Sequence, residues 1–117
     1  MITRLSTRDV DGIAKTLAAG EAFTTHGALS GAPVRIGSAG RLGRLPDEHR
    51  SLWHQGIILA KSGRHTMYAV WSYQTPLCWR VDDGAWIFPE ESYSVTTSRH
   101  QSRIRYAIHL AGGVVSS

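Results

Sequence analysis

The segment 96–103 gathers the side chains best suited to binding a negatively charged group. Hydroxyls, an imidazole and guanidinium groups meet there at the predicted start of a helix, where backbone N–H groups lack intrahelical partners and the helix dipole attracts anions. We expect this seat to accept a phosphate, a carboxylate or an acidic side chain of a partner. The alternative is an ordinary capped helix whose polar residues face water. The candidate residues are Thr96, Thr97, Ser98, Arg99, His100, Gln101 and Arg103.

Aromatic side chains in the central part of the chain form a second candidate contact surface. On an exposed sheet, such rings stack on nucleic-acid bases while arginines hold the phosphates. The run 66–73 is apolar on both faces, so either a helix or a partner must cover one of them. Cover by a helix is the more common outcome, and it would leave no such surface. The aromatic candidates are Trp71, Tyr73, Trp79 and Trp86, with Tyr68 beside them.

The histidines and serines show no known metal-binding or hydrolase motif. His49 and His54 are five residues apart, which is the wrong spacing for one helix face, and there is neither an HExxH motif nor a Cys/His quartet. No GxSxG motif surrounds Ser72, which we interpret as a structural strand residue. We therefore expect no metal, no cofactor and no catalytic serine.

A metal-independent ribonuclease remains a third hypothesis. It needs an acid, a base and a cation beside the phosphate, and His26, His100 and Arg99 or Arg103 would supply them if the fold joined them. No sequence pattern brings His26 to His100. The sequence therefore favours a protein that is not an enzyme.

The chain is basic, and its charge is unevenly distributed. Of its 13 basic residues 11 are arginine, the formal net charge is +4, and no acid follows Arg99. The planar guanidinium suits phosphate and carboxylate. Codon bias in a GC-rich genome would produce the same arginine excess without any function. The charge is consistent with a nucleic-acid or acidic partner and does not choose between them.

The single cysteine and the lack of long apolar segments lead us to expect a cytoplasmic protein. The single cysteine, Cys78, cannot form a disulfide within the chain and lies in an apolar string typical of a buried core. The opening MITRLSTRDVDG lacks the apolar stretch of a signal peptide, and no run approaches the roughly 20 apolar residues of a membrane span. We expect no membrane partner.

Hydrophobic periodicity predicts three helices. The first covers residues 6–20 with a Ser6/Asp9 capping box, and its narrow apolar stripe suggests that it packs by one edge or outside the core. The second starts at Pro46 and ends at 61–63. The third starts at Thr97 or Ser98, and its apolar stripe faces a core. That stripe consists of Ile104, Ala107, Ile108 and Ala111.

Strand signals predict a three-stranded antiparallel meander. Its strands cover 66–73, 77–81 and 85–88, with a break at 74–76 and a hairpin turn at Asp82-Asp83-Gly84 in which Gly84 takes a positive φ. Short strands near Phe23, at 34–36 and at 93–95 could be added. The fold class is therefore α+β, with a sheet of three to four strands packed against two or three helices.

We expect a single domain over residues 1–117. Within it, 1–20 is a helical extension, 21–111 is the core and 112–117 is a tail. An unpaired sheet edge could also support a homodimer.

Two motifs resemble a known family. They are Tyr73-Gln74-Thr75-Pro76-Leu77-Cys78-Trp79 and Tyr93-Ser94-Val95-Thr96-Thr97-Ser98-Arg99-His100-Gln101. Together with the turn at 27–31, they resemble a small domain of unknown function found in actinobacterial phage genomes, over roughly residues 23–105. The resemblance implies a phage accessory protein acting in the host cytoplasm, and it supplies no activity and no catalytic residue.

These observations lead to one functional expectation and two alternatives. We expect a non-enzymatic protein that binds a host macromolecule, and a host protein is the expected partner. A direct nucleic-acid-binding domain is the alternative, and the small ribonuclease-like toxin is the third reading.

Overall fold

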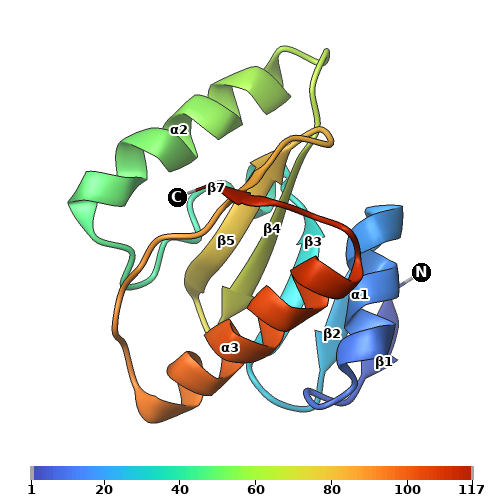
Figure 1. Ribbon diagram of the computed structural model, residues 1–117. Helices are drawn as coiled ribbons and strands as arrows, with labels where there is room; N and C mark the ends of the chain where they lie inside the picture. Colours follow the sequence, from blue (N-terminus) through green and yellow to red (C-terminus); the bar gives the residue numbers. More distant parts are fainter. Residues whose placement is uncertain (1, 117) are drawn as a thin grey trace.

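The protein is a layered α+β domain built on one mixed sheet (Figure 1). The computed structural model describes residues 2–116, with only the backbone described for Ile36. Within that range three α-helices flank a seven-stranded sheet, so the predicted class is confirmed and the sheet is larger than the predicted three to four strands. The strands are β1 (Thr3–Leu5), β2 (Phe23–Thr25), β3 (Leu29–Pro33), β4 (Met67–Ser72), β5 (Thr75–Val81), β6 (Trp86–Ile87) and β7 (Val115–Ser116). The helices are α1 (Val10–Ala19), α2 (Asp47–Lys61) and α3 (Val95–Leu110), and a short 3₁₀ turn, η1, covers Ile36–Ser38.

The strand order in the sheet follows the order in the chain, from β1 to β7. The β1–β2 and β6–β7 pairs are parallel, and all pairs between β2 and β6 are antiparallel. The parallel pairs are bridged by α1 and α3. Since β1 and β6 run in the same direction, crossovers of one handedness place both helices on the same face of the sheet. The other face is left for α2, as Figure 1 shows.

The predicted meander is confirmed as β4, β5 and β6, with different turn residues. The β4–β5 turn is Tyr73-Gln74, and Pro76 lies inside β5 opposite Trp71, next to an irregularity in the pairing. At the next turn, Asp82 takes the positive φ of 51° and Gly84 does not. Asp82 accepts one hydrogen bond from the Thr66 backbone N–H and shares another with His65, and aspartate is among the residues that tolerate this left-handed conformation.

The outer strands correct several sequence predictions. The strand predicted at 34–36 lies earlier, at Leu29–Pro33, and residues 93–95 form no strand, because Val95 already begins α3. The predicted tail forms β7, which pairs with β6. Strands of two or three residues have too few side chains to show an alternating pattern, so only their partners reveal them. Met1 and Ser117, the outermost residues of the predicted extension and tail, lie outside the described residues.

Two apolar clusters fill the spaces on either side of the sheet. One joins α1 and α3 to the sheet, and Ile13 and Leu17 of α1 are completely or almost completely buried in it. The first helix is therefore part of the core, which corrects the expectation that it packs by one edge or lies outside. The other cluster lies under α2, where Trp53 makes edge-to-face contacts with Trp71 and Trp79 at centroid distances of 6.1 and 5.2 Å.

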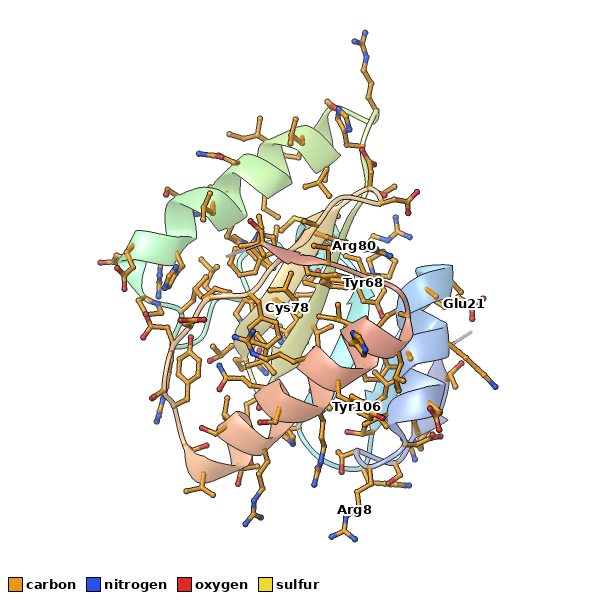
Figure 2. The ribbon with its side chains drawn as sticks, in the orientation of Figure 1. Arg8, Glu21, Tyr68, Cys78, Arg80 and Tyr106 are labelled. Atoms are coloured by element: carbon orange, nitrogen blue, oxygen red, sulfur yellow. The ribbon has the colours of Figure 1, made fainter. Side chains whose placement is uncertain are left out.

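The residues in the middle of the sheet contribute to both clusters. Figure 2 labels Tyr68, Cys78 and Arg80 on the two central strands. Tyr68 and Cys78 are buried in the cluster under α1 and α3, and Cys78 has the core role predicted for it. Arg80 stacks on the ring of Trp86 and donates a hydrogen bond to the Leu17 carbonyl.

Candidate functional site

The start of α3 lies earlier than the sequence predicts, and this changes the anion seat. Ser94 is the N-cap: its hydroxyl accepts the Thr97 N–H at 3.1 Å, and its carbonyl accepts the Ser98 N–H at 2.9 Å. Thr97 and Ser98 are therefore helical residues and not caps. Their amides, which were expected to face an anion, are already occupied.

The seven residues of the predicted seat point in different directions. Thr97 and His100 are buried, and Gln101 donates from its side chain to the Glu91 carbonyl at 3.1 Å. Thr96, Ser98 and Arg99 are exposed, while Arg103 is half-buried. Because one turn of helix distributes consecutive residues around its whole circumference, the run cannot converge on one concavity. Side chains that are close together in the sequence therefore lie on different sides of α3.

A polar cavity of 440 Å³ nevertheless lies beside the start of α3. At its wall the Ser72 hydroxyl shares a hydrogen bond of 2.8 Å with Nδ1 of His100 and lies 3.3 Å from the Thr97 hydroxyl. The Tyr93 hydroxyl is buried here and has no hydrogen-bond partner among the described residues. The lining residues are Arg44, Ser72, Tyr73, Thr75, Tyr93, Ser94, Thr96 and Thr97.

Burial and charge keep His100 neutral. Desolvation lowers the pKa of its imidazole below the usual value, and the nearby positive charge of Arg103 lowers it further. The ring is only 4% exposed. It therefore cannot reach a phosphate in solvent, and the proposed ribonuclease pair of His26 and His100 loses one member. His26 lies exposed in the β2–β3 turn.

Most residues of the predicted aromatic contact surface are buried. Trp71, Trp79 and Trp86 are at most 2% exposed, because α2 covers the first two and the α1–α3 layer covers the third. Only Tyr73, which is 56% exposed in the β4–β5 turn, remains available to a partner. Helices cover both apolar faces of the sheet, so these buried tryptophans cannot stack on nucleic-acid bases.

The outward face of α3 carries a different set of available groups. Arg99, Arg103, Tyr106 and Leu110 follow one another at intervals of four, three and four residues, which places them along one side of the helix. Tyr106 and Leu110 are 54% and 43% exposed. The helix contains no acidic residue, and no ion pair found within residues 2–116 involves Arg99 or Arg103.

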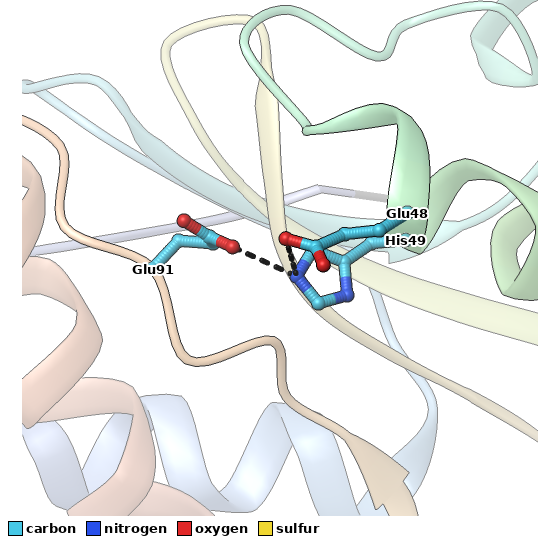
Figure 3. A group of neighbouring side chains, drawn as sticks. All are labelled: Glu48, His49 and Glu91. Atoms are coloured by element: carbon cyan, nitrogen blue, oxygen red, sulfur yellow. Dashed lines mark hydrogen bonds and ion pairs between the residues drawn. The ribbon is translucent and has the colours of Figure 1, made fainter.

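A third group of side chains meets between α2 and the loop after β6 (Figure 3). His49 Nε2 lies 3.0 Å from a carboxylate oxygen of Glu91 and 3.7 Å from one of Glu48. The sequence analysis missed this group because Glu91 is 42 positions from His49 and no metal motif spans them. The sequence held one indication of this group: acidic residues occur at the start of a predicted helix and directly after a predicted strand.

The sequence comparisons place the chain in a family. Residues 41–112 match DUF8033, a family of unknown function, and the chain belongs to that family. The match runs from the loop before α2 to the residue after the C-cap of α3, so it contains all three groups described above. Neither the curated proteins nor the solved structures include a chain that it matches. Within residues 2–116, no helix is long and apolar enough to cross a bilayer.

Proposed function

We propose that this protein is a non-enzymatic accessory protein of the phage type that acts in the host cytoplasm. It binds an acidic surface of a host protein through the exposed face of α3. The observation that carries the proposal is the stripe formed by Arg99, Arg103, Tyr106 and Leu110. The phage setting comes from the sequence resemblance alone.

The charge of α3 supports an anionic partner. Arg99 and Arg103 are one turn apart, and like charges at that spacing destabilise a helix by about 0.2–0.5 kcal/mol. No acid on α3 compensates for this repulsion. Arg105, the third arginine of the helix, lies over the ring of Phe88 at 3.9 Å and so packs against its own fold. Among the described residues, Arg99 and Arg103 form no ion pair and no contact with an aromatic ring, so their guanidinium groups are free to meet a partner.

The apolar part of the stripe favours a protein over a nucleic acid. Tyrosine and arginine are enriched in protein interfaces, and a helix face read at intervals of three and four residues suits docking in a groove. Base recognition would call for exposed stacking rings, whereas the tryptophans of the sheet are buried. A phosphate backbone would use the arginines and leave Tyr106 and Leu110 without a role.

Photo-crosslinking from the stripe tests the proposal. Tyr106 is replaced by p-benzoylphenylalanine, the variant is expressed in an actinobacterial host, and the cells are irradiated. We expect a discrete adduct that protease destroys and nuclease does not. The Arg99→Glu/Arg103→Glu variant should lose it, because the new charges repel an acidic surface. The yield should also fall as salt is added to a lysate, since exposed charges are screened.

A matched control keeps the change in net charge constant. Lys61→Glu/Arg64→Glu alters two exposed cations at the end of α2 and in the turn that follows, so its adduct should persist. An adduct that is sensitive to nuclease would replace the proposal with nucleic-acid binding. An adduct that survives Arg99→Glu/Arg103→Glu would show that the stripe is not the contact surface.

A further inference from the structure

Three potential ligand atoms from distant parts of the chain converge at one point between α2 and the loop after β6. They belong to Glu48, His49 and Glu91, and all lie within 4.8 Å of one another. Figure 3 shows both carboxylates directed toward the same ring nitrogen of His49. The His49 side chain is 21% exposed and that of Glu91 is 26% exposed, so two of the three groups are partly shielded from water.

The charges at this point are unbalanced. Two carboxylates face one imidazole nitrogen, which can hold a single proton. Neither neighbouring arginine forms an ion pair with Glu48 or Glu91 among the described residues: Arg50 binds Asp47 and the Leu45 carbonyl, and Arg105 lies over Phe88. The amino terminus of α2 repels a cation with about half a positive charge, and the two full negative charges outweigh it.

Glu91 and His49 are held in place from outside the group. The Gln101 side chain on α3 donates to the Glu91 carbonyl at 3.1 Å, which ties the loop to a rigid helix. His49 lies in the first turn of α2, and its backbone N–H donates to the Pro46 carbonyl. Ligands fixed by neighbouring elements lose less entropy when they bind an ion.

We propose that Glu48, His49 and Glu91 form a binding site for a divalent transition-metal ion of the zinc type. One imidazole nitrogen and two carboxylate oxygens match the donors that Zn²⁺ accepts, whereas Mg²⁺ and Ca²⁺ prefer oxygen donors alone. Three protein ligands leave a fourth tetrahedral position for water. His49 also lines a cavity of 510 Å³, so its imidazole borders open space. The site is independent of the proposed binding face on α3.

Calorimetric titration of the tag-free chain with ZnCl₂ tests the site. We expect one ion per chain, a higher melting temperature with zinc, and no comparable response to MgCl₂. His49→Ala and Glu91→Gln each remove a ligand, so each should weaken zinc binding by at least the roughly 10–100-fold that loss of an outer-shell partner costs. Glu48→Gln should weaken it as well. Far-UV circular dichroism checks that each variant is folded, and Glu91→Gln nearly preserves the side-chain shape.

The chain contains its own control for adventitious zinc binding. His65 lies 2.6 Å from a single carboxylate, that of Asp82, and belongs to no three-ligand group among residues 2–116. His65→Ala should therefore leave stoichiometry, affinity and the thermal shift unchanged. The proposal is overturned if the wild type gives no heat and no thermal shift. It is also overturned if folded His49→Ala, Glu91→Gln or Glu48→Gln binds zinc like the wild type, or if His65→Ala abolishes binding.

Discussion

Ser72 and His100 meet at a hydrogen bond of 2.8 Å that joins the end of β4 to the second turn of α3. Both side chains are buried, and the Thr97 hydroxyl lies 3.3 Å from that of Ser72. A buried imidazole without a partner would be costly, so Ser72 lets the helix carry a histidine on its inner face. The pair thus helps to fix α3 against the sheet, together with Ile104, Ala107 and Ile108, which are buried on the same helix.

The first prediction concerns pH. The folded chain holds His100 neutral, with its pKa below the ordinary value of 6.5, whereas the unfolded chain protonates it at that value. Above the unfolded pKa the contribution of His100 to stability is fully present. As pH falls from about 6.5, the unfolded state takes up the proton first, so the free energy of unfolding decreases until the folded pKa is reached. Denaturant unfolding between pH 7.5 and 5 measures this loss.

His100→Gln removes the titrating group, so its stability should fall less steeply with acid than that of the wild type. His54→Gln, which removes an exposed imidazole on α2, is the matched control and should keep the wild-type slope. Equal slopes for His100→Gln and the wild type would contradict the assignment. His100→Gln should also be less stable at pH 7.5, in contrast to the nearly unchanged stability that a surface catalytic histidine would predict.

A second prediction separates the two possible starts of α3. Ser94→Ala removes the hydroxyl that accepts the Thr97 N–H, and loss of such a cap costs about 1 kcal/mol of unfolding free energy. Ser98→Ala should be neutral or slightly stabilising, because Ser98 is exposed and alanine has the higher helix propensity. Chemical denaturation of both variants measures the difference. The reverse ranking would restore Ser98 as the cap.

A third prediction concerns the loop that packs on the β4–β5 turn. Gly43 has φ +47°, and a Cβ there would lie 2.6 Å from the Gln74 backbone and would also clash with the Thr75 hydroxyl. Gly43→Ala should therefore cost about 1–3 kcal/mol from backbone strain alone, and more from the clash. Gly40→Ala in the same loop meets open space and should have little effect. Thermal unfolding distinguishes the two, and equal melting temperatures would refute the close packing.

A fourth prediction uses the single cysteine. Burial strongly raises the pKa of the Cys78 thiol, so the reactive thiolate is nearly absent in the folded protein. A thiol reagent should label native Cys78 only as fast as the protein opens, and should label it at once in denaturant. Cys78→Ser/Ser102→Cys, with an exposed thiol on α3, should react immediately under native conditions. Rapid labelling of native wild type would show that Cys78 is accessible.

Periodic patterns of apolar residues predicted the helix faces and the central strands correctly, because neighbouring residues in the chain determine them. The apolar stripe of α3 is buried at Ile104, Ala107 and Ile108, and the meander from β4 to β6 is present. The start of α3 was misplaced because Ser94, Thr97 and Ser98 are all good caps, and only the docked helix shows which hydroxyl meets an amide. The edge strands β1 and β7 were missed because parallel pairing joins residues far apart in the chain.

The sequence by itself determined the α+β class, the central antiparallel strands, the buried cysteine and the concentration of positive charge after Arg99. Tertiary structure alone decided which side chains are available to a partner. It turned His100 inward to Ser72, buried three tryptophans under helices, and brought Glu91 to His49 across 42 positions. The physical reason is that helix rotation and strand pairing set the direction of each side chain, and packing between distant segments fixes both.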